Sequence, residues 1–244
     1  MKLLDIFKLV AWEVVNPLLL HAKKQRRYVF NGSYIGINLG CGMDNPSKWL
    51  GIDGGVYVLL QKVPVPILKL VSRFTETQKK YSVEEYIQKI RGGDFLHHEL
   101  DYGIPFDDNC IPAIFSSHFF EHITQMDANR LLRECFRVLK PGGTIRVVVP
   151  SLDEEVARIR QAVRQYEAGD VSAIQAFVTS NGVGYTNKYD NHRWMYNFAE
   201  MREALRRAGF VQITEVRFRQ GRIPEVEKLD TRGGIFVEAS KPEA

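Results

Sequence analysis

The chain has 244 residues, of which 45% are hydrophobic and 25% are charged, an ordinary composition for one α/β domain with additions. Its formal net charge of +4 is too small, and its basic residues too dispersed, to indicate a nucleic-acid-binding protein. The three cysteines lack CxxC spacing and are odd in number, which argues against a disulfide framework and favours a reducing, cytoplasmic compartment.

Residues 1–22 carry apolar side chains at helical spacing, and a basic stretch follows at residues 23–27. Charged residues interrupt the apolar run, so a membrane-spanning helix is not predicted, and no small-residue cleavage site marks a secretory signal. Pro17 is expected to disturb the end of the helix. Two interpretations stay open: residues 1–27 lie on the anionic inner face of a membrane, or the helix docks on its own domain or on a second subunit.

Residues 34–53 hold the pattern around which the chain is organised. A short apolar run leads into Gly40-Cys41-Gly42, and a second apolar run ends on Asp53. This pattern predicts a buried parallel strand, a glycine turn that a ligand can approach, and a second strand with a carboxylate at its tip. Such a carboxylate can accept hydrogen bonds from both vicinal hydroxyls of a ribose.

An insertion at about residues 54–92 follows. Its first part is apolar and basic, with Pro64 and Pro66 breaking any long helix. Its second part opens with a capping box, Ser82 to Glu85, which predicts a short helix through Ile90. The insertion could cover the active site, hold a lipid-linked acceptor or form a dimer contact. We therefore divide the chain into an N-terminal helix and basic linker (residues 1–30) and a main domain with this insertion (residues 31–244).

The remaining elements alternate between strands and helices. Strands are predicted over residues 95–100 and 113–117, a helix from an N-cap at Asp127 to Pro141-Gly142-Gly143, a strand over 144–149, helices over 151–167 and 197–208, and an antiparallel hairpin over 210–218 and 235–239. Adjacent His97 and His98 would point to opposite faces of a strand, so no metal site is predicted.

Residues 176–197 are aromatic and polar, which is typical of a loop that binds an acceptor, since aromatic rings stack on sugars and basic side chains bind hydroxyls or phosphates. The candidates for substrate contact are Tyr189, Arg193 and Tyr196, and His192 is a candidate base. The alternative is that Tyr196 packs in the core, together with Trp194, and that His192 is an ordinary loop histidine.

Several motifs in order carry a resemblance to a known family. They are Gly40-Cys41-Gly42 with Asp53, Ser117-His118-Phe119-Phe120-Glu121-His122, Leu131-Leu132-Arg133-Glu134, and Arg137-Val138-Leu139-Lys140-Pro141-Gly142-Gly143. Together they resemble the class I S-adenosylmethionine-dependent methyltransferases, most closely a bacterial branch associated with sugar and cell-envelope modification. The resemblance covers residues 34–53 and 93 to the C-terminus. It departs at Asn38, where the family usually has an acid, and at Asp44, where it usually has a third glycine.

The resemblance implies an α/β, Rossmann-like sheet of seven mostly parallel strands, flanked by helices, with the last strand antiparallel. It also implies S-adenosyl-L-methionine as cofactor, with Asp101 facing the adenine amino group. His118, at the end of a parallel strand, would lie near the transferable methyl and is the first candidate base. The residues expected to bind the cofactor are Asn38, Gly40, Cys41, Gly42, Asp53, Asp101, Tyr102 and Ser117.

The function expected from these patterns is methyl transfer to oxygen or nitrogen of a sugar, a nucleotide-sugar or a lipid-linked saccharide, as in polysaccharide biosynthesis. The protein would be cytoplasmic, or peripheral at the inner membrane face, and a homodimer is one option. The alternative is a non-catalytic scaffold with the same fold, motivated by Asn38 and Asp44. A nicotinamide dehydrogenase is disfavoured, because the later glycine of the dinucleotide fingerprint is missing.

Overall fold

The protein forms one seven-stranded sheet in the order β3-β2-β1-β4-β5-β7-β6. The computed structural model describes residues 14–72, 81–172, 175 and 192–243. The strands are β1 (Gly36–Leu39), β2 (Trp49–Asp53), β3 (Asp94–His97), β4 (Ile111–Ser117), β5 (Leu139–Val149), β6 (Val211–Val216) and β7 (Ile235–Ser240). The first five pair in parallel, and β7 runs antiparallel to both β5 and β6. The predicted fold class is confirmed.

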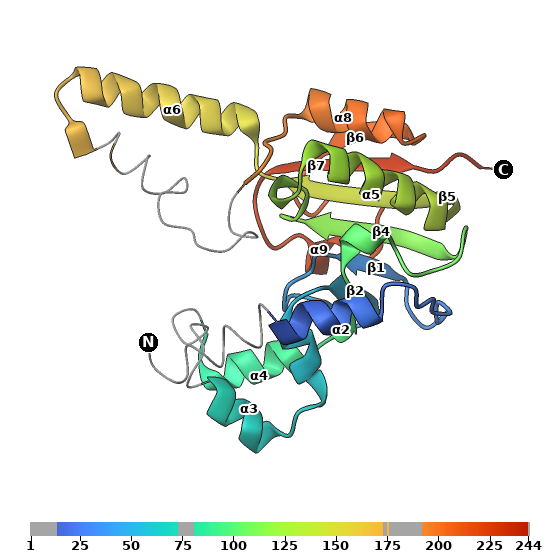
Figure 1. The fold of residues 1–244 in the computed structure, drawn as a ribbon. Helices are drawn as coiled ribbons and strands as arrows, with labels where there is room; N and C mark the ends of the chain where they lie inside the picture. The colour runs from blue at the N-terminus through green and yellow to red at the C-terminus, as the bar shows by residue number, and fades with distance from the viewer. Residues whose placement is uncertain (1–13, 73–80, 173–174, 176–191, 244) are drawn as a thin grey trace.

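Helices cover the two faces of the sheet unequally. The longer ones are α2 (Asn16–Ala22), α3 (Val65–Ser72), α4 (Val83–Arg91), α5 (Gln125–Val138), α6 (Leu152–Glu167) and α8 (Phe198–Arg207), and α9 (Val226–Leu229) is a single turn. Figure 1 shows α5 and α8 over one face, whereas α6 projects away from the sheet. The main core lies under α5 and α8, and a smaller core under the connection that contains α9 covers the opposite face.

The N-terminal segment docks on the main domain through Asn16 and Leu20 of α2. Asn16 donates a 2.9 Å hydrogen bond to the Gly54 carbonyl and its side-chain oxygen lies 2.8 Å from Nε2 of His97, while Leu20 is buried. Pro17 lies in the first turn of α2, where proline is tolerated, and α2 continues to Ala22. Residues 14 and 15, directly before α2, are π-helical, so the helix changes type beside Pro17. Residues 1–13 lie outside the described residues. None of the helices in the described part of the chain has the length and apolar character needed to cross a bilayer.

The predicted helix ends differ from the observed ones at α5. Thr124, not Asp127, is the N-cap, because the Thr124 hydroxyl accepts the Asp127 N–H at 3.2 Å. The helix ends at Val138, and Pro141-Gly142-Gly143 lies inside β5, not at the helix stop. By contrast, the predicted capping box of α4 is confirmed: Ser82 accepts from the Glu85 N–H, and Glu85 accepts from the Ser82 N–H.

A buried ion-pair network fixes the connection between β6 and β7. The Arg146 guanidinium on β5 pairs with Asp230 and Glu238, and all three side chains are fully buried. Arg146 also donates to the carbonyls of Arg217 and Gln220, at the start of the connection. Since four hydrogen bonds of this one side chain reach Arg217, Gln220 and Asp230, residues 217–230 are held against the sheet.

Candidate functional site

The turn after β1 leaves the backbone open on one side. Gly40 and Gly42 have φ values of +60° and +57°, a region that glycine adopts without steric cost. A side chain at Gly40 would overlap the Phe119 ring, whereas the space beside Gly42 is free of protein atoms within 4 Å. The turn can therefore receive a ligand at Gly42 and is braced by Phe119 at Gly40.

Asp53 lies at the tip of β2, beside this turn. Its two carboxylate oxygens accept the N–H groups of Gly42 at 3.0 Å and of Gly55 at 2.7 Å. The Tyr57 hydroxyl also bonds to Asp53, and burial together with this carboxylate raises the pKa of Tyr57 well above its usual value. Asp53 thus faces the glycine turn as predicted from the sequence, and Tyr57 from the insertion is the neighbour that a ribose would meet there.

A pocket of about 450 Å³ extends from the glycine turn. Asn38 and Cys41 line it on one side, Phe115 and Ser117 of β4 form its floor, and α4 closes another wall. The last wall is the segment 228–232, which the Arg146 network holds in place. The insertion was predicted to cover the active site, to hold a lipid-linked acceptor or to form a dimer contact. Its helix α4 lines this pocket. The pocket lies at the carboxyl ends of β1 and β4, where open parallel sheets bind ligands.

Asn38 fits a ligand with donor groups. It is buried, its Nδ2 donates to the Asp44 carbonyl and to Asn45 Oδ1, both at 3.2 Å, and within the described residues its Oδ1 has no hydrogen-bond partner. A buried acceptor without a partner is costly, and an ammonium group would satisfy it. This acceptor, the open side of Gly42 and the Asp53 carboxylate together match the amino acid and ribose ends of S-adenosylmethionine.

Cys41 also lines the pocket, but as a neutral thiol. Burial, and next the negative charge of Asp53, raise the pKa of Cys41 well above its usual value. The residue therefore contributes shape to the turn, and its thiol is not poised as a nucleophile.

Asp101 and Tyr102 lie apart from this pocket. The strand β3 ends at His97, so both residues fall on the short turn Leu100–Tyr102. The half-exposed Asp101 carboxylate lies 3.9 Å from Arg130, and the Lys24 ammonium lies over the Tyr102 ring. The Glu99 carboxylate, and not that of Asp101, lies near the end of β2. A Cβ atom at Gly54, the residue after β2, would lie 3.4 Å from a carboxylate oxygen of Glu99. The sequence analysis missed Glu99 because it extended the strand to residue 100.

A second group of polar side chains follows β4. His118 has a positive φ of 53°, an unusual conformation for a residue other than glycine. Its Nε2 lies 2.9 Å from the Gly233 carbonyl, and its Nδ1 lies 3.2 Å from Oε1 of the fully buried Glu121. Both ring nitrogens therefore face protein oxygens, and the role of His118 as proton acceptor stays a prediction.

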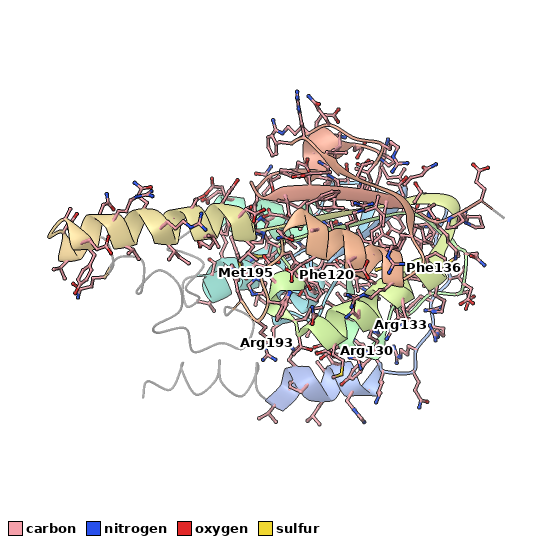
Figure 2. The ribbon with its side chains drawn as sticks, turned by 90° about the horizontal axis from the view of Figure 1, so that it is seen from above. Phe120, Arg130, Arg133, Phe136, Arg193 and Met195 are labelled. Carbon is pink, nitrogen blue, oxygen red and sulfur yellow. The ribbon has the colours of Figure 1, made fainter. Side chains whose placement is uncertain are left out.

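The segment after residue 191 returns to Glu121. The Arg193 N–H donates to the Glu121 carbonyl at 2.6 Å, and the His192 ring lies 5.1 Å from that of His122. The Arg193 side chain points outward, on the side of the molecule where α2 lies (Figure 2). Tyr196 is a core residue, as in the alternative interpretation, and burial raises its pKa to about 12. Tyr189 lies outside the described residues.

No metal site was predicted, but the structure brings three possible ligands together. One ligand atom each from Glu121, His122 and His192 lie within 4.8 Å of one another. The sequence alone could not find this group, because 69 or more positions separate His192 from the other two. The paired Glu121-His122 was the available signal.

The chain was compared with curated proteins and with solved structures. No curated protein matches the chain. Among solved structures, a methyltransferase of Archaeoglobus fulgidus is 13% identical, with 97% of this chain and 99% of that one covered and a TM-score of 0.43. The 1,6-didemethyltoxoflavin-N1-methyltransferase of Burkholderia thailandensis is 15% identical, with 98% of this chain and 82% of that one covered and a TM-score of 0.42.

A family model gives the more direct finding. The model described as a methyltransferase domain matches residues 37–147, which run from β1 to β5 and include the glycine turn, Asp53 and the polar group after β4. The strand order and the antiparallel β7 agree with this family's fold. Residues 37–147 therefore match a methyltransferase domain, and the seven-stranded sheet around them has the Rossmann-like methyltransferase fold.

Proposed function

We propose that the pocket beside Gly42 holds S-adenosylmethionine through the glycine turn, Asn38 Oδ1, Asp53 and Ser117. The observation that carries this proposal is the pairing of an open backbone at Gly42 with the Asp53 carboxylate, which lies 3.0 Å from the Gly42 nitrogen. When bound, the cofactor supplies an activated methyl group. The residues of this chain then have to orient the acceptor and exclude water.

Titration calorimetry with S-adenosylmethionine and S-adenosylhomocysteine tests the cofactor site. We expect the wild type to bind both, Asp53→Asn to bind at least about tenfold more weakly, and Asp108→Ala to bind as the wild type does, because Asp108 lies on an exposed turn and pairs with Arg137. A folded wild type that binds neither compound would contradict the proposal and support the non-catalytic scaffold. Equal binding by Asp53→Asn would remove Asp53 from the site.

We further propose that the acceptor is a sugar that carries phosphate, such as a nucleotide-sugar or a lipid-linked saccharide. Lys89, Lys228 and Arg232 all line the pocket. Lys89 and Lys228 pair with Asp44 and Glu225, whereas Arg232 has no ion-pair partner in the described part of the chain. An exposed guanidinium at the pocket mouth can bind phosphate in a bidentate manner.

The acceptor proposal is tested by product analysis. Mass spectrometry should detect methylation of nucleotide-sugars and not of the corresponding uncharged sugars, and Arg232→Gln should raise KM for the acceptor with little change in kcat. Methylation of uncharged sugars with the same efficiency would contradict a phosphate-bearing acceptor.

We also propose that α2 rests on an anionic membrane surface. Since Asn16 and Leu20 face the domain, Val14 and Leu18 stay exposed, Leu18 by 65%. Exposed Lys24 and Arg26 follow directly. An apolar helix face next to basic side chains suits the boundary of an anionic bilayer.

Vesicle sedimentation tests this surface in the full chain. We expect pelleting with phosphatidylserine vesicles, less pelleting for Val14→Ser/Leu18→Ser, and none with neutral vesicles. Val29→Ser is the matched control, because Val29 is 91% exposed but lies outside the helix. If the helix variant pellets as well as the control, α2 is not the membrane contact.

A further inference from the structure

The carboxylate of Glu121 lacks the compensation that a buried charge requires. The side chain has no exposed surface, and among the described residues neither oxygen has a hydrogen-bond partner. Removing a carboxylate from water without such bonds is strongly unfavourable unless a positive charge lies beside it. The backbone around Glu121 is nevertheless well fixed, because its carbonyl accepts the N–H groups of Arg193 and Trp194.

Three of the six histidines of the chain surround this carboxylate. His118 Nδ1 lies 3.2 Å from Oε1 and His122 Nε2 lies 3.8 Å from the same atom. The His192 ring stands at 72° to that of His122, with the ring centres 5.1 Å apart. The two backbone hydrogen bonds from Arg193 and Trp194 to the Glu121 carbonyl hold His192, the residue before them, beside Glu121.

We propose that Glu121, His122 and His192 bind a divalent transition-metal ion of the zinc or iron class. Imidazole and carboxylate ligands suit these ions, and two histidines with one carboxylate form a three-ligand site that leaves coordination positions open. The ion supplies the positive charge that the buried Glu121 carboxylate needs. His118, whose Nε2 lies against the Gly233 carbonyl, contacts Glu121 Oε1 through Nδ1 and positions this carboxylate.

The observed geometry reaches metal-binding distances with small movements. Bonds of about 2.0–2.1 Å in a tetrahedral site hold the ligand atoms about 3.4 Å apart. The ligand atoms of the three residues lie within 4.8 Å of one another, and His192 is exposed, so a rotation of its ring closes the site. Glu121 and His122 need little change, because the short helix Phe120–His122 already fixes their backbone.

The site lies next to the cofactor pocket. His118 directly follows Ser117, which lines the pocket, and the Phe119 ring packs against Gly40 of the glycine turn. An acceptor hydroxyl bound at an open position of the ion would lose its proton to solvent more easily. Its oxygen could then bond to the methyl group as the methyl–sulfur bond of S-adenosylmethionine breaks, which leaves S-adenosylhomocysteine. This catalytic role rests on the proposed function, whereas binding of the ion does not.

The test is metal binding by the full chain, purified without a histidine tag and freed of metal. Equilibrium dialysis with Zn²⁺ and the visible absorption of bound Co²⁺ should show one ion per chain. His192→Ala and Glu121→Gln should each weaken binding at least about tenfold, and Co²⁺ absorption should lose intensity. His21→Ala is the matched control, because His21 is an exposed histidine on α2 and should leave binding unchanged.

Two outcomes would overturn the proposal. One is a folded, metal-free protein that takes up no ion at stoichiometric concentration. The other is uptake that neither His192→Ala nor Glu121→Gln weakens. His192 is exposed, so its substitution tests the site even if Glu121→Gln fails to fold. Failure of cofactor binding would leave the metal stoichiometry unchanged, so the two proposals fail separately.

Discussion

The protein buries carboxylates in two places, and the two places differ in how the charge is compensated. Asp230 and Glu238 share one guanidinium, and Glu238 also accepts the Arg222 N–H at 2.8 Å. Among the described residues, the ion-pair contacts of Glu121 are both with histidine rings, His118 and His122. A fully compensated network rigidifies the fold, whereas a poorly compensated carboxylate indicates a site that a ligand completes. The Arg146 network holds one wall of the pocket, and the Glu121 group is the site at which we propose that an ion binds.

Removing the cation from the compensated network should have the largest effect. Arg146→Met leaves Asp230 and Glu238 buried without their partner, and we expect a loss of about 3–5 kcal/mol in the free energy of unfolding. Urea denaturation measures this loss. Arg207→Met is the matched control: Arg207 pairs with Glu203 at the surface, and its removal should cost less than about 1 kcal/mol. Equal losses in the two variants would show that the buried network does not hold the fold.

The pH dependence of stability should come from His97, a buried histidine with a partner at each ring nitrogen. Burial, and next the charge of Lys23, lower the pKa of His97 to about 4. The folded state therefore keeps His97 neutral, with Lys23 Nζ 2.9 Å from Nδ1. As pH falls from about 6.5 towards 4, the unfolded chain binds a proton that the folded protein does not. Stability is thus full above about pH 6.5 and declines below it, by an amount on the order of 2–3 kcal/mol.

Unfolding curves at pH 7.5 and pH 5 check this dependence in the wild type and in His97→Gln, which cannot be protonated. We expect the decline to be smaller in His97→Gln. Since Asn16 and Lys23 both contact His97, the same loss should loosen α2, which hydrogen exchange of residues 16–22 would detect. A wild type as stable at pH 5 as at pH 7.5 would contradict the assigned neutral state.

The smallest effect on stability should come from Glu121→Gln. In the metal-free protein this change removes a charge that makes no hydrogen bond among the described residues, so we expect a change within about 1 kcal/mol. Denaturation of the metal-free variant and wild type measures it. A loss as large as that of Arg146→Met would mean that the surrounding histidines already compensate the carboxylate, and the contrast between the two places would disappear.

The sequence by itself determined most of the individual strands and helices and the glycine turn, whereas the seven-stranded arrangement was expected from the family resemblance. Local signals were sufficient for these elements: the alternation of strands and helices, Gly40 and Gly42 followed by Asp53, the capping box of α4 and the helix predicted from residue 197 all appear in the structure. These signals depend on residues a few positions apart, whose conformational preferences act within one turn or one strand.

Only the tertiary structure decided which distant residues meet. Pairing of β3 with β2 ends at His97, which moves Asp101 onto an exposed turn and brings Glu99 to the strand end. Docking of the segment after residue 191 brings His192 to Glu121, and the Arg146 network brings residues 228–232 to the pocket. Periodicity reports which face of an element is buried, but it carries no information on which other element covers that face.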